Sequence, residues 1–449
     1  MNRLPLAGAL CVALMGAAQP QAHDQGLLVD IRHATGADIE SMKQTAGVDW
    51  WLELGDRLLL VGDRATVSRH AAQSLRGVAL DSIASERLAL HARGCADHAT
   101  TIGSVIAEAG RWEVRQLGAG VVMPESDEWQ SVSQDSVLAR RYRPDEFPRP
   151  PADTFTQSVV DAVDPARWFA DVTTLAGWDR HSKNTAQLTL ARNWVGAQFS
   201  SLGLTVTTPP FTAGGFTASN VIGTWTGTVL PAEWIIVGGH YDSRNASSGS
   251  TGSSITNTPG AEDNASGCAG VVELARVIVA TQPERSVLFM CYAGEEQGLY
   301  GSKAHVTALQ ASGDIGKVKH AMIMDMIGYS ATADIEVLLE SNIAQQAIIT
   351  TYEQAATTYV PELGLMTATN ANGSDHVPYL NAGRSSLLTI ENDWNIYPNY
   401  HRSTDTPANM GSHAQAMGGA ILRMNAAVLV GLTRRADPVF ADGFDSLAP

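Results

Sequence analysis

Runs of apolar residues that alternate with helical patterns constrain the fold of this chain more than any other feature of its sequence. Strand-like runs cover residues 233–239, 286–292, 321–327, 335–339 and 386–390. Helical patterns cover residues 165–177, 185–202, 268–280, 302–310 and 412–432. Strands that are apolar throughout indicate a mainly parallel sheet that helices cover on both faces. The sequence therefore predicts an α/β fold with a mixed, mainly parallel sheet sandwiched between helices.

Polar clusters begin where these strands end, which is where sheets of this kind place their ligands. His240 and Asp242 stand two residues apart at the end of the 233–239 strand, so their side chains point the same way. His240 can ligate a metal while Asp242 holds its other ring nitrogen, as is usual for zinc-bound histidines. Taken alone, such a pair is more often structural.

Carboxylates form the next two clusters. Asp263 lies in segment 260–267, just before a helix, where it either caps the helix or bridges two metal ions. Glu295 and Glu296 follow a buried strand, and adjacent carboxylates there repel each other unless a cation or a proton separates them. One of them can therefore ligate a metal while the other stays free as a base; the alternative is a solvated acidic loop.

The remaining candidate ligands are Asp325 and His401. Asp325 is a lone carboxylate in an apolar run, which is costly unless it is paired or metal-bound, and His401 lies in a loop before the last helix. The clusters together supply two histidines and three carboxylates, with Glu295 left over, and such ligands suit catalytic zinc. Two zinc ions would acidify a bridging water and polarise a carbonyl, while Glu295 would carry the proton to the leaving amine. This chemistry is hydrolysis of an amide.

Short motifs follow one another in a characteristic order: His-Tyr-Asp, Gly-Ala-Glu-Asp-Asn-Ala-Ser-Gly, Gly-Glu-Glu, Met-Asp-Met-Ile-Gly, Ser-Asp-His and a late histidine. This order resembles that of the secreted bacterial leucyl aminopeptidases of metallopeptidase family 28, over about residues 160–434. The resemblance implies an eight-stranded mixed sheet between helices and two zinc ions. It implies that Glu295 is the general base and Asp242 the partner of His240. It also implies two ligand sets, the first His240, Asp263 and Asp325 and the second Asp263, Glu296 and His401.

Several details depart from the family pattern or leave a role open. Relatives commonly have Asp-Asp where this chain has Asp263-Asn264, so the ligand is kept but its neighbour's charge is lost. Residues 367–373 lack the tyrosine and the cysteine bridge that several relatives carry, which leaves open what binds the reacting carbonyl; Tyr397 and Asn372 are the candidates. Five residues lie where relatives line an apolar side-chain pocket, although plain core packing accounts for them equally well: Met326, Leu388, Ile390, Trp394 and Tyr397.

The chain divides into five segments. Residues 1–22 combine an early positive charge, a short apolar stretch and small residues, which is typical of a secretory signal peptide. A proline-rich linker, 142–154, separates an N-terminal region, 23–141, from the peptidase-like region, 155–434. Residues 435–449 form a tail without an assigned role. We therefore expect a secreted protein, extracellular or periplasmic.

The N-terminal region shows a weak duplication that predicts a small α+β domain. Two strand–helix–strand patterns follow one another, the first at 27–32, 37–45 and 58–62 and the second at 88–92, 100–109 and 120–123. The region contains no cluster of catalytic groups. A folded prosegment, as in a zymogen, is favoured over a substrate-binding module.

Charge, apolar content and cysteine content bear on the partners of the chain, on membrane insertion and on disulfides. Thirty Lys and Arg against 46 Asp and Glu give a net charge of −16, which argues against nucleic-acid binding. No later apolar stretch matches the one in the leader, so stable membrane insertion is not expected, and we expect a monomer. Cys95, Cys268 and Cys291 remain after the leader, and buried free thiols are favoured over a disulfide.

The function predicted from the sequence is that of an exported metallo-aminopeptidase with two zinc ions. It would remove N-terminal residues from peptides and favour apolar, Leu-like ones. Glutaminyl cyclase or carboxypeptidase chemistry on the same fold is the alternative. A receptor ectodomain that has lost its metal is disfavoured, because all five ligand positions are filled.

Overall fold

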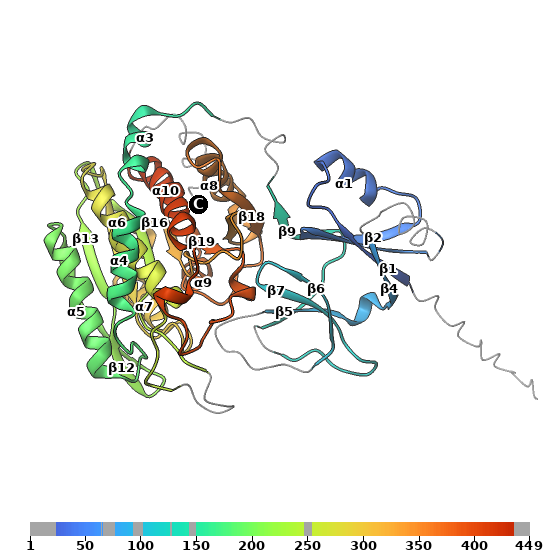
Figure 1. Ribbon diagram of the computed structural model, residues 1–449, viewed down its shortest axis with the longest axis horizontal. Coiled ribbons are helices and arrows are strands. Elements are labelled where there is room, and N and C mark those ends of the chain that lie inside the picture. The colour runs from blue at the N-terminus through green and yellow to red at the C-terminus, as the bar shows by residue number, and fades with distance from the viewer. Residues whose placement is uncertain are drawn as a thin grey trace, which may run out of the picture.

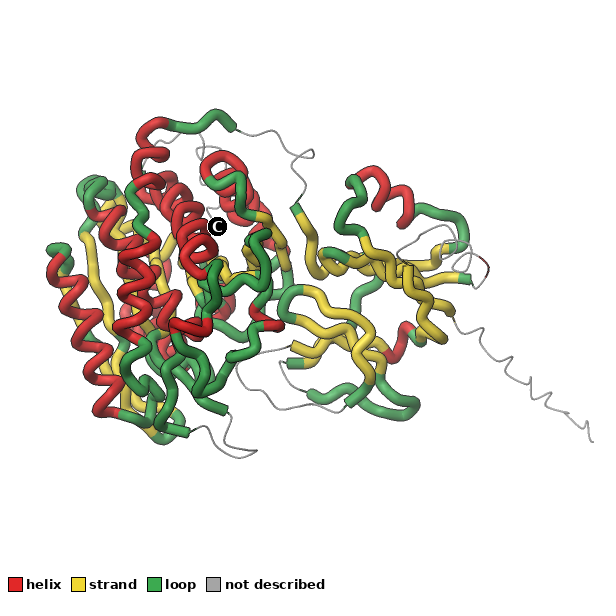
Figure 2. Tube along the Cα trace, viewed as in Figure 1, coloured by secondary structure: helices red, strands yellow, loops and turns green. Residues whose placement is uncertain are grey.

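The computed structural model describes residues 24–63, 65, 77–92, 102–125, 128–142, 150–246 and 254–434 (Figure 1). The predicted signal peptide, residues 143–149 of the predicted linker and the C-terminal tail lie outside these residues. A thirteen-stranded mixed sheet runs through both the N-terminal and the C-terminal regions. Helices gather around the C-terminal part of this sheet, whereas strands dominate the N-terminal part (Figure 2). The α/β class predicted from the sequence is confirmed.

Eight strands of the C-terminal region form one half of the sheet, in the order β10-β13-β15-β14-β16-β19-β17-β18. Four of their seven pairings are parallel, including those that join the central strands. The mixed, mainly parallel sheet is therefore present as predicted. The strands are β10 (Thr205–Thr207), β13 (Val221–Trp225), β14 (Leu230–His240), β15 (Arg285–Tyr292), β16 (Val318–Met324), β17 (Glu336–Glu340), β18 (Gly364–Ala368) and β19 (Ser386–Glu391). A separate hairpin joins β11 (Pro210–Ala213) to β12 (Phe216–Ser219).

The central strands bury side chains on both faces of the sheet. In β14, Ile235 and Val237 belong to one hydrophobic core and Ile236, between them, belongs to the other. This alternation follows from the two-residue period of a strand and explains why the strand is apolar throughout. Helices cover the first core with α3 (Thr154–Asp161), α4 (Pro165–Leu175), α5 (Thr185–Ser201), α6 (Gly267–Val279), α8 (Gln346–Tyr359) and α10 (Ala414–Thr433), and the second with α7 (Tyr300–Ser312) and α9 (Val377–Asn381).

Helix α10 is long and apolar enough to cross a membrane. However, 89% of its apolar window is buried inside the protein, packed against the sheet and the neighbouring helices. Burial of this extent is what a central core helix requires, and it accounts for the apolar sequence of α10.

The N-terminal region continues the same sheet with β9-β2-β3-β1-β4 and adds a four-stranded sheet, β6-β7-β5-β8. Helix α1 (Gly36–Lys43) confirms the first predicted helix. The strands are β1 (Asp24–Asp30), β2 (Val48–Gly55), β3 (Arg57–Gly62), β4 (Gly77–Ile83), β5 (Leu88–Ala92), β6 (Ser104–Ala109), β7 (Trp112–Gln116), β8 (Trp129–Ser131) and β9 (Ser136–Arg141).

Two predictions for the N-terminal region are wrong. The described residues 102–109 do not form a helix; Ser104–Ala109 form β6, which pairs with β7 across a tight turn at Gly110, a residue with a φ of +56°. Residues 120–123 do not form a strand, and Val122 is 85% exposed. In both places a glycine with positive φ sets the local path, and helical or strand propensity yields to turn geometry.

The cysteine prediction is also wrong. Cys268, at the start of α6, and Cys291, near the end of β15, form a disulfide with their Cα atoms 5.7 Å apart. That separation lies in the usual range for a disulfide. The two residues are 23 positions apart in sequence, and only the packing of α6 on the sheet brings them together.

A buried histidine predicts how stability responds to acid. His320 of β16 is fully buried and its ring nitrogens lie 3.0 Å from the Ser385 hydroxyl and 2.9 Å from the Tyr352 hydroxyl. Burial lowers the pKa of His320 to about 3. Between the ordinary pKa and this value the unfolded chain binds a proton that the folded chain does not. Stability is therefore lost as the pH falls, by about 3 kcal/mol at pH 4.

The test compares urea unfolding of the metal-free protein at pH 7 and pH 4, for the wild type and for His320→Gln. We expect the wild type to lose about 3 kcal/mol more stability than the variant between the two pH values. Equal losses in the two proteins would show that His320 does not contribute to acid sensitivity.

Candidate active site

Parallel strands bring the predicted site residues to one edge of the sheet. His240 is the last residue of β14, Asp325 directly follows β16, and Glu295 and Glu296 follow β15. These strands are neighbours in the sheet, and their carboxyl ends lie at the same edge. The sheet topology alone therefore juxtaposes an imidazole and three carboxylates.

Two further side chains reach this edge from loops. Asp263 lies in a short irregular helical turn, Ala261–Ser266, that leads into α6, and its peptide bond to Asn264 is cis. His401 lies in the loop between β19 and α10. The seven residues predicted to bind metal or to catalyse are each at most 5% exposed. The structure thus brings together every member of the predicted ligand set.

Asp263 stands between the two histidines. Its Oδ1 lies 3.3 Å from Nε2 of His240, and its Oδ2 lies 3.0 Å from Nε2 of His401. Oδ1 of Asp325 lies 3.4 Å from the same His240 nitrogen, and Oε2 of Glu296 lies 3.2 Å from the His401 nitrogen. The two oxygens of one carboxylate therefore face two separate imidazole–carboxylate pairs, which is the arrangement of a bridging ligand.

Glu295 lies beside the first of these pairs. Its Oε2 is 3.8 Å from Nε2 of His240, and Glu295, His240 and Asp325 form one group whose potential ligand atoms lie within 4.8 Å of one another. Asp263, Glu296 and His401 form a second such group. Glu295 is fully buried, and its carboxylate is close enough to act on a group bound between His240 and Asp325.

The site stabilises positive charge. Burial opposes ionisation of Asp263, but hydrogen bonds from His240 and His401 outweigh it and lower the pKa of Asp263. Burial, reinforced by the charge of Asp263, raises the pKa of Glu296 to about 7. Burial also raises the pKa of Glu295 well above its ordinary value, although the nearby His240 opposes this effect. Two imidazoles and four buried carboxylates form a donor set that suits divalent cations such as zinc.

Asp242 positions two of these groups. Nδ1 of His240 lies 3.1 Å from the Asp242 backbone carbonyl and 3.6 Å from its carboxylate. A proton on Nδ1 leaves the lone pair of Nε2 available to a metal ion. The Asp242 carboxylate also accepts hydrogen bonds from the backbone N–H groups of Glu295, at 3.2 Å, and Glu296, at 3.3 Å. The predicted partner of His240 therefore also fixes the loop that carries Glu295.

Asp405 supports the bridging ligand, a role that the sequence did not reveal. Its carboxylate accepts hydrogen bonds from the backbone N–H groups of Glu262, at 2.9 Å, and Asp263, at 3.1 Å. The Tyr397 hydroxyl donates to the same carboxylate at 2.7 Å. The Tyr397 hydroxyl thus binds the same carboxylate that supports the Asp263 turn. The signal available in the sequence was the position of Asp405, four residues after His401.

Ser374 orients Asp325. Its hydroxyl donates to Oδ2 of Asp325 at 2.7 Å, which leaves Oδ1 facing His240. Ser374 directly follows the loop 369–373, so this loop positions a potential metal ligand. Asn372, the other residue considered for binding the carbonyl, donates its backbone N–H to Glu340 at 3.0 Å.

Asn264 accounts for one departure from the family pattern. Its Oδ1 accepts from the N–H groups of Gly267, at 2.7 Å, and Met326, at 3.1 Å, while its Nδ2 donates to the Met324 carbonyl at 3.0 Å. An aspartate can accept the first two bonds but cannot make the third. In this chain the amide links the Asp263 turn to the end of β16.

We therefore expect Asn264→Asp to destabilise the protein. The substitution removes a buried donor and adds a charge beside other carboxylates, which costs about 2–4 kcal/mol. Chemical unfolding at pH 8, in chelator, measures this cost. The exposed Asn193→Asp change on α5 is the control and should leave stability unchanged, and an equally small effect at Asn264 would contradict the proposed bonding.

The five predicted pocket residues are all buried. Their exposed fractions are at most 5%, and they belong to the second hydrophobic core, the one that also contains Trp112 and Val114 of the N-terminal region: Met326, Leu388, Ile390, Trp394 and Tyr397. Packing therefore accounts for these side chains, and their role toward substrate stays a prediction. A further aromatic residue, Tyr400, stacks on the His401 ring with centroids 3.8 Å apart.

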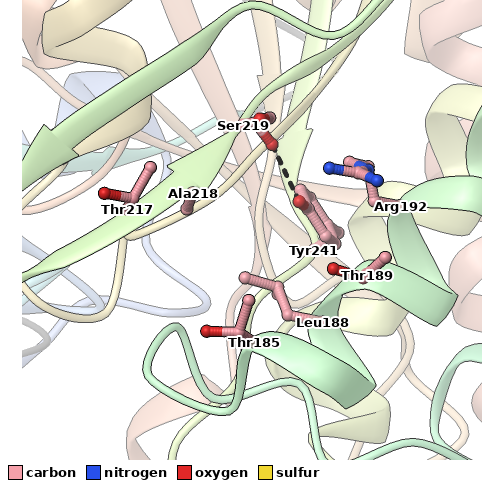
Figure 3. A pocket seen from close by; sticks show the side chains of 8 residues that line it. All are labelled: Thr185, Leu188, Thr189, Arg192, Thr217, Ala218, Ser219 and Tyr241. Carbon is pink, nitrogen blue, oxygen red and sulfur yellow. Dashed lines mark hydrogen bonds between the residues drawn. The ribbon is translucent and has the colours of Figure 1, made fainter.

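A separate cavity lies next to the end of β14. It has a volume of about 280 Å³ and is lined by α5, β12 and Tyr241, whose hydroxyl donates to the Ser219 carbonyl at 2.8 Å (Figure 3). Its eight lining residues include none of the clustered carboxylates and histidines. The side chain of Tyr241 points away from the site that its neighbours His240 and Asp242 build.

Comparisons with known proteins agree with this geometry. Residues 220–424 match the model of peptidase family M28. A protein of Pyricularia oryzae named "Probable zinc metalloprotease" is 36% identical over 169 residues, which are 33% of this chain and 33% of that protein. "Leupeptin-inactivating enzyme 1" of Streptomyces exfoliatus is 32% identical over 42% of this chain and 40% of its own length. The chain thus spans about a third to two-fifths of the length of these relatives.

Solved structures share the fold. The LapA aminopeptidase of Legionella pneumophila matches with a TM-score of 0.54 at 16% identity, and the match covers 92% of this chain and 99% of the LapA chain. The aminopeptidase from Aneurinibacillus sp. strain AM-1 matches with a TM-score of 0.51 at 16% identity, and the match covers 63% of this chain and 97% of the aminopeptidase chain. The matched family segment contains both histidines and all five acids of the site. Residues 220–424 of this chain are therefore a peptidase family M28 domain.

Proposed function

We propose that this chain is an exported, zinc-dependent aminopeptidase that hydrolyses peptides from their N-terminus. The observation that carries the proposal is the bridging position of Asp263, whose two oxygens face His240 and His401. The relatives named zinc metalloproteases support zinc as the metal. Two ions fit the two ligand groups, His240 and Asp325 on one side and Glu296 and His401 on the other, with Asp263 shared between them.

The chain's own residues would divide the work as follows. When bound, zinc supplies a Lewis acid that acidifies a water and polarises the scissile carbonyl. Glu295 takes a proton from the attacking water and delivers it to the leaving amine. Asp242 holds the loop of Glu295 in place, and Ser374 and Asp405 fix Asp325 and Asp263. Burial of these groups excludes bulk water.

Charge supports action at the N-terminus rather than at the C-terminus of a peptide. A free α-amino group is positive, and the site is lined by the carboxylates of Glu295, Glu296 and Asp325. With zinc bound, Glu295, the carboxylate that is not assigned as a ligand, would still repel a C-terminal carboxylate. The preference for apolar, Leu-like N-terminal residues rests on the five predicted pocket residues.

Export, peptide partners and the monomeric state belong to the same proposal. The sequence of residues 1–22 supports export, and the net charge of −16 supports partners other than nucleic acid. The buried state of α10 supports a protein without stable membrane insertion.

Hydrolysis of leucine p-nitroanilide tests the proposal. We expect the activity to fall to background after chelation and to return with zinc, because the metal supplies the Lewis acid that the reaction needs. N-acetyl-leucine p-nitroanilide, which has no free amine, is the matched control and should not be hydrolysed. Equal cleavage of both substrates, or activity that survives chelation, would contradict a zinc aminopeptidase. Cyclisation of N-terminal glutamine without hydrolysis would favour glutaminyl cyclase chemistry.

A further inference from the structure

One turn of the N-terminal region contacts the loops that surround the candidate active site. The turn joins β6 to β7 and consists of Gly110 and Arg111, which is 3% exposed. Gly110 lies against β18: a Cβ added there would be 3.2 Å from the Cβ of Ala368. A φ of +56° and this close approach both favour glycine.

Arg111 binds the loop that leads to Ser374. Its Nη2 donates to the Gly373 carbonyl at 2.7 Å, and Nε1 of the adjacent Trp112 donates to the Asn370 carbonyl at 2.7 Å. Two donors from the N-terminal region therefore fix both ends of the segment 370–373. The next residue, Ser374, is the one that orients Asp325.

The same turn contacts the predicted substrate pocket. The Arg111 guanidinium lies over the Trp394 ring, 5.5 Å from its centroid. Nδ2 of Asn395 donates to Glu108 of β6 at 2.9 Å. The N-terminal region thus holds two segments of the peptidase region, one that carries the support of Asp325 and one that carries a predicted pocket residue.

The N-terminal region is also joined to the C-terminal half of the thirteen-stranded sheet. β9 pairs with β18 from Ala139 to Arg141, and β2 pairs with β9. Arg141 forms ion pairs with Asp56 of its own region and with Glu336 of β17. Trp112 is fully buried in a core that it shares with Leu338 and Leu388. Removal of residues 24–142 would expose this core and leave β18 as an open sheet edge.

From these contacts we infer that residues 24–142 remain a permanent part of the enzyme and that Arg111 is a positioning residue for its active site. Arg111 acts through Gly373 and Ser374 on Asp325, and through Trp394 on the substrate pocket. This inference rests on the proposed function. It assigns the N-terminal region a role that a removable prosegment does not have.

Arg111→Ala in the full-length protein is the first test. We expect KM for leucine p-nitroanilide to rise about tenfold, because the Trp394 segment and the loop at Gly373 both lose the guanidinium that holds them, while kcat of the zinc-saturated enzyme changes less than about twofold. Arg111→Lys should restore part of the affinity, since its ammonium can still donate to the carbonyl. Arg115→Ala is the matched control, because Arg115 lies on the same hairpin but bonds to Glu113, Ile102 and Gly103.

Hydrogen exchange gives a readout that does not depend on activity. Amides of residues 369–376 should exchange faster in Arg111→Ala than in Arg115→Ala. If the wild type hydrolyses no aminoacyl substrate, the proposed function fails, but this comparison still decides whether Arg111 holds the loop. Equal exchange in the two variants, or an equal rise of KM in both, would overturn the role of Arg111.

A cut within residues 143–149 tests whether the region is permanent. After a specific protease site is placed there and cleaved, we expect both fragments to elute together in size-exclusion chromatography, with unchanged specific activity. Separation of the fragments with a rise in activity would overturn the inference and identify an inhibitory prosegment.

Discussion

Glu295→Gln is expected to lower kcat by about 10³-fold while zinc stays bound, because general acid–base catalysis by a side chain contributes about 10²–10⁴. Glutamine has the shape of glutamate but cannot accept and return a proton. Glu295 is fully buried, and Asp242 holds its backbone N–H at 3.2 Å, so the amide should occupy the same place. The metal sites keep His240, Asp263 and Asp325 on one side and Glu296 and His401 on the other. KM should therefore change little.

Steady-state kinetics with leucine p-nitroanilide and zinc analysis by atomic emission measure both quantities. Glu353→Gln is the matched control: Glu353 is also a buried glutamate, and burial raises its pKa to about 7, but it lies on α8 away from the site. We expect it to keep wild-type kcat. A Glu295→Gln enzyme with undiminished kcat would rule out Glu295 as the base, and one that loses zinc would make Glu295 a ligand.

The C-terminal fold could be predicted because its strands are buried on both faces. Residues such as Ile235, Ile236 and Val237 are apolar without alternation, and in a short strand-like run this pattern indicates burial on both sides. The order of motifs along the strands then placed His240, Glu296 and Asp325 at one edge. The two wrong secondary-structure predictions fell where turns decide the structure, at Gly110 and in residues 120–123, because local propensity does not report the φ of a glycine.

The residues that support the site through hydrogen bonds were harder to predict than the site residues themselves. Asp405 and Ser374 act through hydrogen bonds to Asp263 and Asp325 that only the folded loops create. The pairing of Cys268 with Cys291 likewise depends on how α6 packs against β15. The contacts of Arg111 join regions far apart in the chain, with a separation of 262 positions in the case of Gly373, and no local pattern encodes them.

The position of Asp263 between the two histidines predicts the result of Asp263→Asn. A carboxylate can bind one cation through each oxygen, whereas an amide offers a single acceptor oxygen and no charge. Because Asp263 contributes to both ligand groups, the variant should bind less than one zinc per chain. Loss of the metal removes several kcal/mol of transition-state stabilisation, so we expect kcat/KM to fall by about 10³-fold or more.

Glu296→Gln provides the comparison that isolates bridging. Glu296 belongs to one ligand group, with His401 at 3.2 Å, so its loss should empty one site and leave about one zinc in the other. Zinc content should thus fall in the order wild type, Glu296→Gln, Asp263→Asn. Thermal unfolding with and without zinc checks the same order, because metal that binds the folded state stabilises it by an amount that grows with the ratio of free metal to Kd. Two tightly bound zinc ions in Asp263→Asn would show that each metal is held without a shared carboxylate, and the two ligand groups would then be independent sites.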